Sequence, residues 1–246
     1  MEIIDIVTVV NDIDKYTRYF LNNDNVNSNN LIYFDNTKDN HTIPKRLNSF
    51  IENQMTEDNW ILFCHQDFYI QQTLSQKINE QLDKNYIYGP VGAGTKKQFT
   101  FFMRLDGLKI AKFRIGLVEK QVIKGQVIED NGSKIKIAGS KVKDHEEVNT
   151  LDCCCFIIHS SQIKKMNFKF DENLDWHLYA EDLCMYASEN YQISSKILNI
   201  KSTHFSSGNF NQGFQNSLNY LISKYPSKAI VSTCYDGAYQ RFLDKL

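Results

Sequence analysis

Short apolar runs rich in β-branched residues recur along the first third of the chain, and each run ends in polar or glycine residues. The runs cover 3–10, 31–34, 60–64 and 86–88, and helix-like segments cover 16–21, 43–53 and 74–82. Strands buried in a parallel sheet are continuous apolar runs, and their alternation with helices implies crossover connections. The pattern predicts an α/β fold with a Rossmann-like, mainly parallel sheet and helices on both faces.

Ligands of such sheets bind at the carboxyl ends of the strands. Asn11, Asp35, His65, Asp67 and the stretch Gly89–Gly94 follow the predicted strands. All of these are also common turn residues, so each position alone is equally compatible with ordinary loop chemistry. Their convergence on one edge of the sheet is the first functional signal.

The second half of the chain continues the alternation. Strands are predicted at 151–158 and 193–200, helices at 176–188 and 218–224, and a polar loop at 204–213. Because neither an internal repeat nor a linker is visible, we expect one domain, 1–246. It would comprise a first half at 1–94, a basic insertion at 95–150, and a second half with a C-terminal tail at 151–246.

The insertion is basic. Its part from Thr95 to Lys143 carries 12 Lys and Arg against four acidic residues, a net charge of +8. Residues 126–137 alternate around Asn131 and Gly132, which predicts a β-hairpin. A solvated hairpin with lysines on its exposed face is one interpretation, and guidance of an anionic acceptor is the other. Phe99, Phe101, Phe102 and Phe113 would pack in the core, contact lipid or stack on sugar rings.

Composition narrows the classes of function. The hydrophobic share of 42%, the charged share of 23% and the net charge of −1 are typical of a globular protein. A net charge near zero disfavours nucleic acid as a partner. No run approaches the length of a membrane span, and the first residues do not resemble a signal peptide, so we expect a cytoplasmic protein. The six cysteines include no CxxC pair and are expected to be reduced.

Two motifs carry candidate chemistry. His65-Gln66-Asp67 closes a strand, where a carboxylate can hold Mg²⁺ or Mn²⁺ on a diphosphate and His65 can add a nitrogen ligand. A zinc site of His65, His177 and His204 is less favoured, since these residues lack helical spacing. Glu181-Asp182 lies near a predicted helix start, where it either takes a proton or simply complements the helix dipole.

Taken in order, these segments resemble the GT-A-fold, family 2-like bacterial glycosyltransferases, in particular the subgroup with a His-Gln-Asp motif. The matching elements are 6–12, 35–37, 43–48, 60–67, 89–94, 151–152, 170–172, 176–184 and 204–208. The resemblance covers nearly all of the chain except the basic insertion and the tail. One departure is Ala180 in Tyr179-Ala180-Glu181-Asp182-Leu183-Cys184, because the subgroup has an Asp at that position.

The resemblance implies roles for individual residues. Donor binding would fall to Asn11, Asp35, Asn48, His65, Asp67, Gly92 and Asp152, with Asn11 and Asp35 around the base and ribose and Asp152 in the sugar and acceptor pocket. Asp67, joined by His204, would hold Mn²⁺ or Mg²⁺ on the diphosphate. Asp182 would be the general base, with Glu181 as its substitute.

The activity that the resemblance implies is metal-dependent transfer of a sugar from a nucleotide diphosphate sugar, with uridine as the commonest nucleotide, to an acceptor hydroxyl. The acceptor would be a glycan or a lipid-linked glycan in bacterial surface polysaccharide or lipooligosaccharide synthesis, reached by peripheral contact with the inner face of the membrane. A single displacement would invert the anomeric centre. Two alternatives stay open: a sugar-nucleotide nucleotidyltransferase, and a nucleotide-sugar-binding module without catalysis. The first should carry a Gly-rich basic loop where this chain has Asn11-Asp12-Ile13-Asp14-Lys15.

Overall fold

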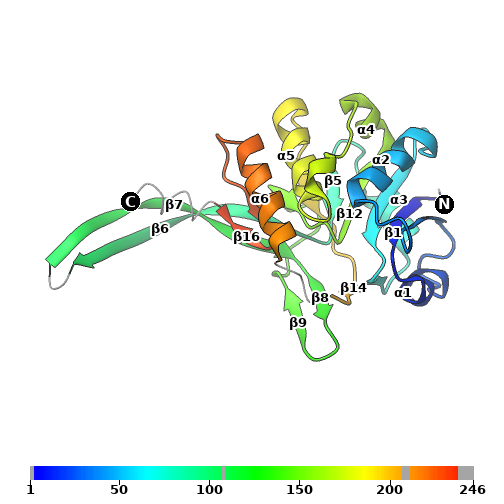
Figure 1. Ribbon diagram of the computed structural model, residues 1–246, viewed down its shortest axis with the longest axis horizontal. Coiled ribbons are helices and arrows are strands. Elements are labelled where there is room, and N and C mark those ends of the chain that lie inside the picture. Colours follow the sequence, from blue (N-terminus) through cyan, green and yellow to red (C-terminus); the bar gives the residue numbers. More distant parts are fainter. Residues whose placement is uncertain (1–2, 107–108, 207–210, 238–246) are drawn as a thin grey trace.

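The computed structural model describes residues 3–106, 109–206 and 211–237, with the backbone alone for 75–76, 79–80, 100–106 and 109–118. Its centre is a seven-stranded sheet in the order β10-β13-β5-β12-β3-β1-β2 (Figure 1). In that order the strands are Glu147–Val148, Ser195–Ile197, Ile87–Gly89, Cys155–His159, Trp60–His65, Asp5–Val10 and Asn30–Asp35. β1 runs parallel to β2 and β3, and β13 runs parallel to β5. Since only β12 and β10 run antiparallel to their neighbours in this sheet, the predicted mainly parallel α/β sheet is confirmed.

Helices cover both faces of the sheet. The apolar residues of β3 alternate between two cores, with Ile61 and Phe63 in one and Leu62 in the other. The first core packs against α2 (Ile43–Asn53), α4 (Ser160–Met166), α5 (Tyr179–Tyr191) and α6 (Gln212–Lys224). The second packs against α1 (Ile13–Tyr16), the π-helix η1 (Thr17–Leu21) and α3 (Leu74–Gln81). A short 3₁₀ helix, η2, covers Glu172–Leu174.

Three helices begin away from their predicted residues. The one predicted at 16–21 begins as α1 at Ile13, where the Asp12 carboxylate caps it by accepting from the Lys15 N–H, and it continues as η1. α5 begins at Tyr179 and not at 176, because Asp175 and Leu178 have φ values of 49° and 62° and interrupt the helical path. α6 begins at Gln212, six residues before the prediction, because the side chain of Asn211 caps it by accepting from the Phe214 N–H at 3.1 Å.

The predicted strand at 151–158 is two strands. β11 (Thr150–Leu151) and β12 are separated by a turn in which Asp152 accepts a hydrogen bond from the Cys154 N–H at 2.9 Å. The turn moves Asp152 and Cys153 out of the sheet. It therefore frees the side chain of Asp152 for the site described below.

The sequence suggested a loop at the glycine stretch 89–94, but the structure has two strands there. β5 ends at Gly89, and Gly92 lies within the long strand β6 (Val91–Asp106), where it pairs with Leu151 of β11. A Cβ on Gly92 would lie 2.4 Å from the carbonyl oxygen of Thr150, so this glycine permits close backbone packing. Gly92 was expected to bind the donor, and close packing against Thr150 is a structural reason for glycine at this position.

The basic insertion contains two hairpins. The one predicted around Asn131 and Gly132 is confirmed as β8 (Val127–Asp130) and β9 (Ile135–Ala138). The second, which the sequence analysis did not predict, pairs β6 with β7 (Lys109–Gly125) and extends far from the body as a two-stranded ribbon (Figure 1). Among the described helices, none combines the length and the apolar character that crossing a bilayer requires.

Two short ladders complete the fold. β4 (Phe68–Ile70) pairs with β14 (Ser202–His204), which also pairs with β8, so that His204 lies beside both Phe68 and Glu129. Near the end of the chain, β15 (Val231–Ser232) pairs with β16 (Tyr235–Asp236). The hydroxyl of Thr150 holds this hairpin to β11 by donating to the Val231 carbonyl at 2.6 Å.

We predict that Gly92→Ala lowers the free energy of unfolding by about 1–3 kcal/mol, the usual effect of overpacking. Gly94→Ala in the same strand is the matched control, because its Cβ would lie 3.7 Å or more from its neighbours. Urea denaturation followed by circular dichroism measures both. Equal stability of the two variants would show that the backbone contact at Gly92 does not constrain the fold.

Candidate active site

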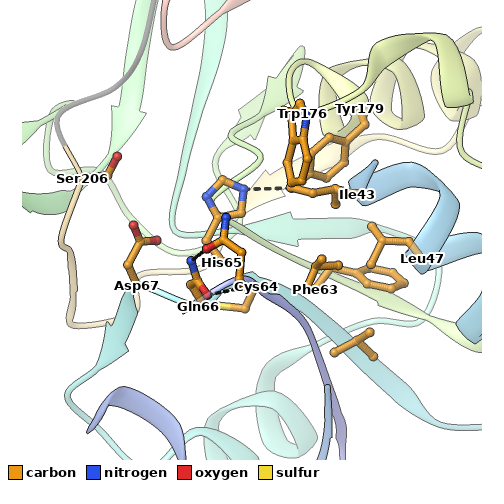
Figure 2. Close-up of a pocket in the computed structure, with 13 residues that line it drawn as sticks. Ile43, Leu47, Phe63, Cys64, His65, Gln66, Asp67, Trp176, Tyr179 and Ser206 are labelled. Atoms are coloured by element: carbon orange, nitrogen blue, oxygen red, sulfur yellow. Dashed lines mark hydrogen bonds between the residues drawn. The ribbon is translucent and has the colours of Figure 1, made fainter. Parts of the chain in front are cut away.

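Two adjoining cavities lie at the carboxyl ends of β1 and β3. The first has a volume of about 330 Å³ and is bounded by β1, β3, α2 and the segment before α5; the second has about 220 Å³. Three residues, His65, Trp176 and Ser206, line both cavities. The first cavity combines apolar side chains of β1, β3 and α2 with the polar groups Asn11, Gln66 and Asp67. Figure 2 shows Gln66 and Asp67 on one side of it and Ile43, Leu47 and Phe63 on the other. The second is more acidic, as it includes Glu129, Asp152 and Glu181.

Gln66, the middle residue of the His-Gln-Asp motif, ties the turn after β3 to the turn after β1. Its side-chain oxygen accepts hydrogen bonds from the N–H groups of Asn11 and Asp12, both at 2.9 Å, and its amide donates to the Asn11 side chain. Asn11 is thereby fixed at the rim of the first cavity. Asp12 also caps α1, because its carboxylate accepts from the Lys15 N–H at 3.1 Å.

The outer residues of the motif meet His204. One ligand atom from each of His65, Asp67 and His204 lies within 4.8 Å of the other two, although 204 is 137 positions from 67 along the chain. His204 Nε2 is 3.3 Å from an Asp67 oxygen, but it is buried and makes no hydrogen bond among the described residues. A buried ring nitrogen whose contact with a carboxylate lacks hydrogen-bond geometry is incompletely satisfied, and a metal ion would satisfy it. The residues present therefore fit a divalent cation.

The donor set bears on which cation fits. Two imidazole nitrogens and one carboxylate oxygen suit a first-row transition metal better than Mg²⁺, which prefers an all-oxygen shell. His177, the third member of the alternative zinc set, lines the second cavity without joining the cluster of His65, Asp67 and His204.

Tyr179 determines which nitrogen of His65 faces the cluster. The Tyr179 hydroxyl donates to the Cys153 carbonyl at 3.1 Å, so its oxygen must accept the 2.9 Å hydrogen bond that joins it to His65 Nε2. His65 Nε2 is then protonated, which leaves Nδ1 with its lone pair. The second ring nitrogen is turned toward the side on which Asp67 lies (Figure 2). Burial and the neighbouring His204 lower the pKa of His65 to about 4, so the ring is neutral, as a metal ligand must be.

His204 and Asp67 form a charge-complementary pair. Burial opposes the ionisation of both, yet their mutual contact raises the pKa of His204 and lowers that of Asp67. Loss of the His204 proton would free a ring nitrogen for a cation, whose positive charge would then face the Asp67 carboxylate.

Asp152 and Glu181 supply the acidic wall of the second cavity. Burial opposes the ionisation of Asp152, but hydrogen bonds from the Thr233 hydroxyl and the Cys154 N–H lower its pKa. Glu181 is only 3% exposed, and burial, reinforced by the charge of Asp152, raises its pKa to about 8. The Cys153 thiol donates to Glu181 at 3.1 Å. Two carboxyl groups with separated pKa values are a common basis for acid and base roles.

Asp182, the expected base, lines neither cavity. It is 2% exposed, its carboxylate lies 2.9 Å from Lys224 Nζ, and it accepts from the Tyr225 hydroxyl at 2.8 Å. Lys224 also contacts Asp171 at 2.8 Å, so the three charged residues join α5 to α6. Burial raises the pKa of Asp182 despite these partners. The surroundings of Asp182 are those of a structural residue that connects two helices.

Asp35 and Asn48 also lie outside the two cavities. Asp35 ends β2 beside Val10, and its carboxylate accepts from the N–H and the hydroxyl of Thr37 at 2.9 and 2.7 Å. Asn48 is buried, donates to the Phe170 carbonyl and accepts from the Phe170 N–H. Asn48 therefore anchors α2 to the segment before η2, whereas Asp35 is exposed at the edge of the site.

The structure adds Tyr179, Trp176, Thr233 and Cys153 to the site. Trp176 and Tyr179 belong to the segment 176–184 that carries part of the family resemblance, but the sequence assigned neither residue a role. Thr233 lies in the part of the chain interpreted as a tail, and no motif marks it. Its contact with Asp152 depends on the fold of β15 and β16.

The sequence matches no family model and no curated protein. Among solved structures it is similar to S. aureus TarS, a GT-A-type glycosyltransferase, with a TM-score of 0.54 and 12% identity over 94% of this chain and 41% of that one. The TarS fragment 1–349 gives a TM-score of 0.49 with 13% identity over 92% of this chain and 74% of the fragment. The inositol-1-phosphate CTP transferase of T. maritima gives 0.37 with 9% identity over 92% and 97% of the two chains. This chain thus has the GT-A type of fold, and it spans less than half of the longer TarS chain.

We predict that Tyr179→Phe weakens Mn²⁺ binding by about 10- to 100-fold, the usual effect of losing a group that orients a metal-binding histidine. Asp67→Ala should remove binding altogether. Tyr186→Phe is the matched control, because its hydroxyl donates to the Met166 carbonyl elsewhere on α5. Calorimetry with Mn²⁺ alone measures affinity, and thermal melting checks the fold. Wild-type affinity in Tyr179→Phe would exclude the positioning role.

Proposed function

We propose that this protein is a metal-dependent glycosyltransferase that transfers a sugar from a nucleotide diphosphate sugar to a hydroxyl of a glycan or lipid-linked acceptor. The observation that carries the proposal is the place of His65, Asp67 and His204. Their cluster lies where a cavity with an apolar wall at the strand ends adjoins a second cavity with a pair of carboxyl groups. A donor of this class needs the same order of environments, from nucleoside through diphosphate to sugar.

The two cavities hold different parts of the donor. The nucleoside lies in the first, against the apolar wall and near Asn11, with Asp35 at the outer edge. The sugar and the acceptor hydroxyl share the second with Asp152 and Glu181. Mn²⁺ held by His65, Asp67 and His204 supplies positive charge that stabilises the departing diphosphate.

Glu181 is the general base of the proposed reaction. Its carboxylate lines the second cavity, and a pKa of about 8 is closer to the optimum for proton transfer at neutral pH than that of an exposed carboxyl. Asp152, ionised beside it, orients the sugar by accepting from its hydroxyl groups. Glu181 takes the proton of the acceptor hydroxyl as that oxygen attacks the anomeric carbon from the face opposite the diphosphate. One displacement of this kind inverts the anomeric centre.

The alternatives have less support. A nucleotidyltransferase needs a loop that cradles phosphates after the first strand, whereas here Asp12 starts α1 only two residues after β1 ends. A binding module without catalysis has no need of a buried carboxyl with a raised pKa beside the sugar position.

A thermal-shift screen of UDP, CDP and GDP sugars with and without Mn²⁺ tests the proposal. A ligand at 100 times its dissociation constant stabilises the protein by about 2.7 kcal/mol, which a melting curve resolves. A stabilising donor that is then hydrolysed or transferred establishes a glycosyltransferase. Binding without turnover under all acceptors tried would favour the non-catalytic module, and cleavage only with a nucleoside triphosphate would favour the nucleotidyltransferase.

We predict that Glu181→Gln lowers kcat by about 10²- to 10⁴-fold with little change in donor affinity, because it removes the general base. Asp182→Asn is the matched control on the adjacent helical position. It should retain kcat within a few-fold and alter stability instead, since its partners are Lys224 and Tyr225. Steady-state kinetics and calorimetry with the donor measure the two effects. The opposite result, an inactive Asp182→Asn and an active Glu181→Gln, would return the role to Asp182.

The pH dependence of turnover follows from the raised pKa of Glu181. A base must be ionised to accept a proton, so kcat should rise with pH and level off above an apparent pKa of about 8. Asp152→Asn should shift this apparent pKa downward, because it removes a neighbouring negative charge that raises it. A profile that is flat from pH 6 to 9 would contradict the assignment.

A further inference from the structure

The long ribbon of β6 and β7 is not explained by the proposed transfer reaction. It extends well beyond the body of the protein (Figure 1). In the described part of the chain, β6 has β7 as its strand partner along its whole length and β11 only at Gly92 and Ala93. A two-stranded ribbon is marginal in water on its own, so a ribbon of this length is expected to rest against a partner.

The register of the two strands separates their residues by character. Alternate residues of a strand share a face, and directly paired residues lie on the same face. Before the register shift between Arg104 and Leu105, one face holds the polar pairs Thr95–Gln121 and Lys97–Glu119 and then the pairs Phe99–Leu117, Phe101–Ile115 and Met103–Phe113. The last three pairs are apolar throughout, so the outer part of the ribbon is amphipathic.

The opposite face is basic. Its paired positions include Lys96 with Lys120 and Arg104 with Lys112, and Phe102 pairs there with Arg114. Together the two strands contain eight Lys and Arg against two acidic residues, a net charge of +6. Positive charge is thus concentrated in the two strands of the ribbon, although the net charge of the whole protein is −1.

On β6, the first residue of the three apolar pairs is exposed to solvent. This residue, Phe99, is 66% exposed. An exposed Phe at the start of a row of apolar residues indicates an interaction surface rather than a core.

We propose that the β6–β7 ribbon is a membrane-docking element that lies on a bilayer containing anionic lipids, with its apolar face in the interfacial region. Amphipathic segments with apolar and Lys/Arg-rich faces bind at this depth, and long basic side chains can reach the headgroups around their edges. Charge complementarity selects this partner over a second copy of the chain. Apolar pairing of two ribbons would bring together two charges of +6, whereas an anionic surface neutralises them.

Docking would also orient the site. The base of the ribbon pairs with β11, and Leu151 of β11 directly precedes Asp152 of the second cavity. A ribbon lying on a membrane would hold that cavity at a fixed distance from the lipid surface, where a lipid-linked acceptor is found. This consequence rests on the proposed function, but docking itself does not.

Co-sedimentation of the full chain with phosphatidylcholine vesicles, with and without about 30% phosphatidylserine, tests the proposal. We expect binding to the anionic vesicles that weakens as salt is raised. Phe101→Ser should reduce the partition coefficient by about tenfold or more. Phe102→Ser is the matched control, because it removes the same side chain from the neighbouring position on the opposite face, and its effect should be at most a few-fold.

The contribution of charge is measured in the same assay. Lys112→Gln combined with Arg114→Gln should weaken binding to anionic vesicles by about 30-fold, since each basic residue near the surface contributes about a factor of five. Lys134→Gln with Lys136→Gln in the other hairpin is the control and should have little effect. Donor binding by calorimetry should be unchanged in all four variants, which separates failure of docking from failure of the proposed function.

Three outcomes would overturn the proposal. The first is absence of binding to anionic vesicles, and the second is an equal loss from Phe101→Ser and Phe102→Ser. The third is a dimer in analytical ultracentrifugation that Phe101→Ser dissociates while vesicle binding is absent. That last result would assign the apolar face to a second copy of the chain.

Discussion

The three-residue ladder between β4 and β14 determines whether the site exists at all. It pairs Phe68 with His204, and the Phe205 N–H extends it by donating to the Asp67 carbonyl at 2.8 Å. This register brings His204 to the motif that ends β3. A shift of one residue would turn His204 to the other face of the ladder, because side chains alternate along a strand. The parallel pairing of β14 with β8 holds the ladder from its other edge, which gives the hairpin of the basic insertion a part in positioning the cluster.

The candidate site also depends on hydrogen bonds between turns that are far apart in the sequence. Gln66 connects the turn after β3 to the turn after β1, and Tyr179 connects β3 to the start of α5 through His65. Thr233 adds the C-terminal hairpin through Asp152. The contacts of Gln66 and Tyr179 are hydrogen bonds of ordinary geometry, whereas His204 Nε2 in the cluster has an ion-pair contact with Asp67 at 3.3 Å but no hydrogen bond among the described residues.

The sequence was informative where a local pattern has one physical outcome. Apolar runs predicted the central strands, and Asn131-Gly132 predicted its hairpin. The sequence was less informative about features that depend on contacts between residues far apart in the chain. Gly92 looked like a loop glycine, since nothing local reveals that Thr150 packs against its backbone. The choice between Glu181 and Asp182 is similar: neighbours on a helix point about 100° apart, and only the packed structure shows which one meets the cavity. Contacts from Tyr179 to His65 and from Thr233 to Asp152 leave no local trace.

The three buried carboxyl groups near α5 illustrate how surroundings assign chemistry. Asp152 accepts hydrogen bonds from a hydroxyl and a backbone N–H, which favour its charged form. Asp182 has Lys224 and Tyr225, so its charge is compensated and holds two helices together. The side chain that donates to Glu181 is the Cys153 thiol, and burial and nearby carboxylates raise the pKa of that thiol, so it stays a weak neutral donor. Glu181 therefore has less to compensate its negative charge than Asp152 or Asp182 has, and its pKa is raised to about 8. A carboxylate formed at so high a pKa takes up a proton readily, which is the property required of a base.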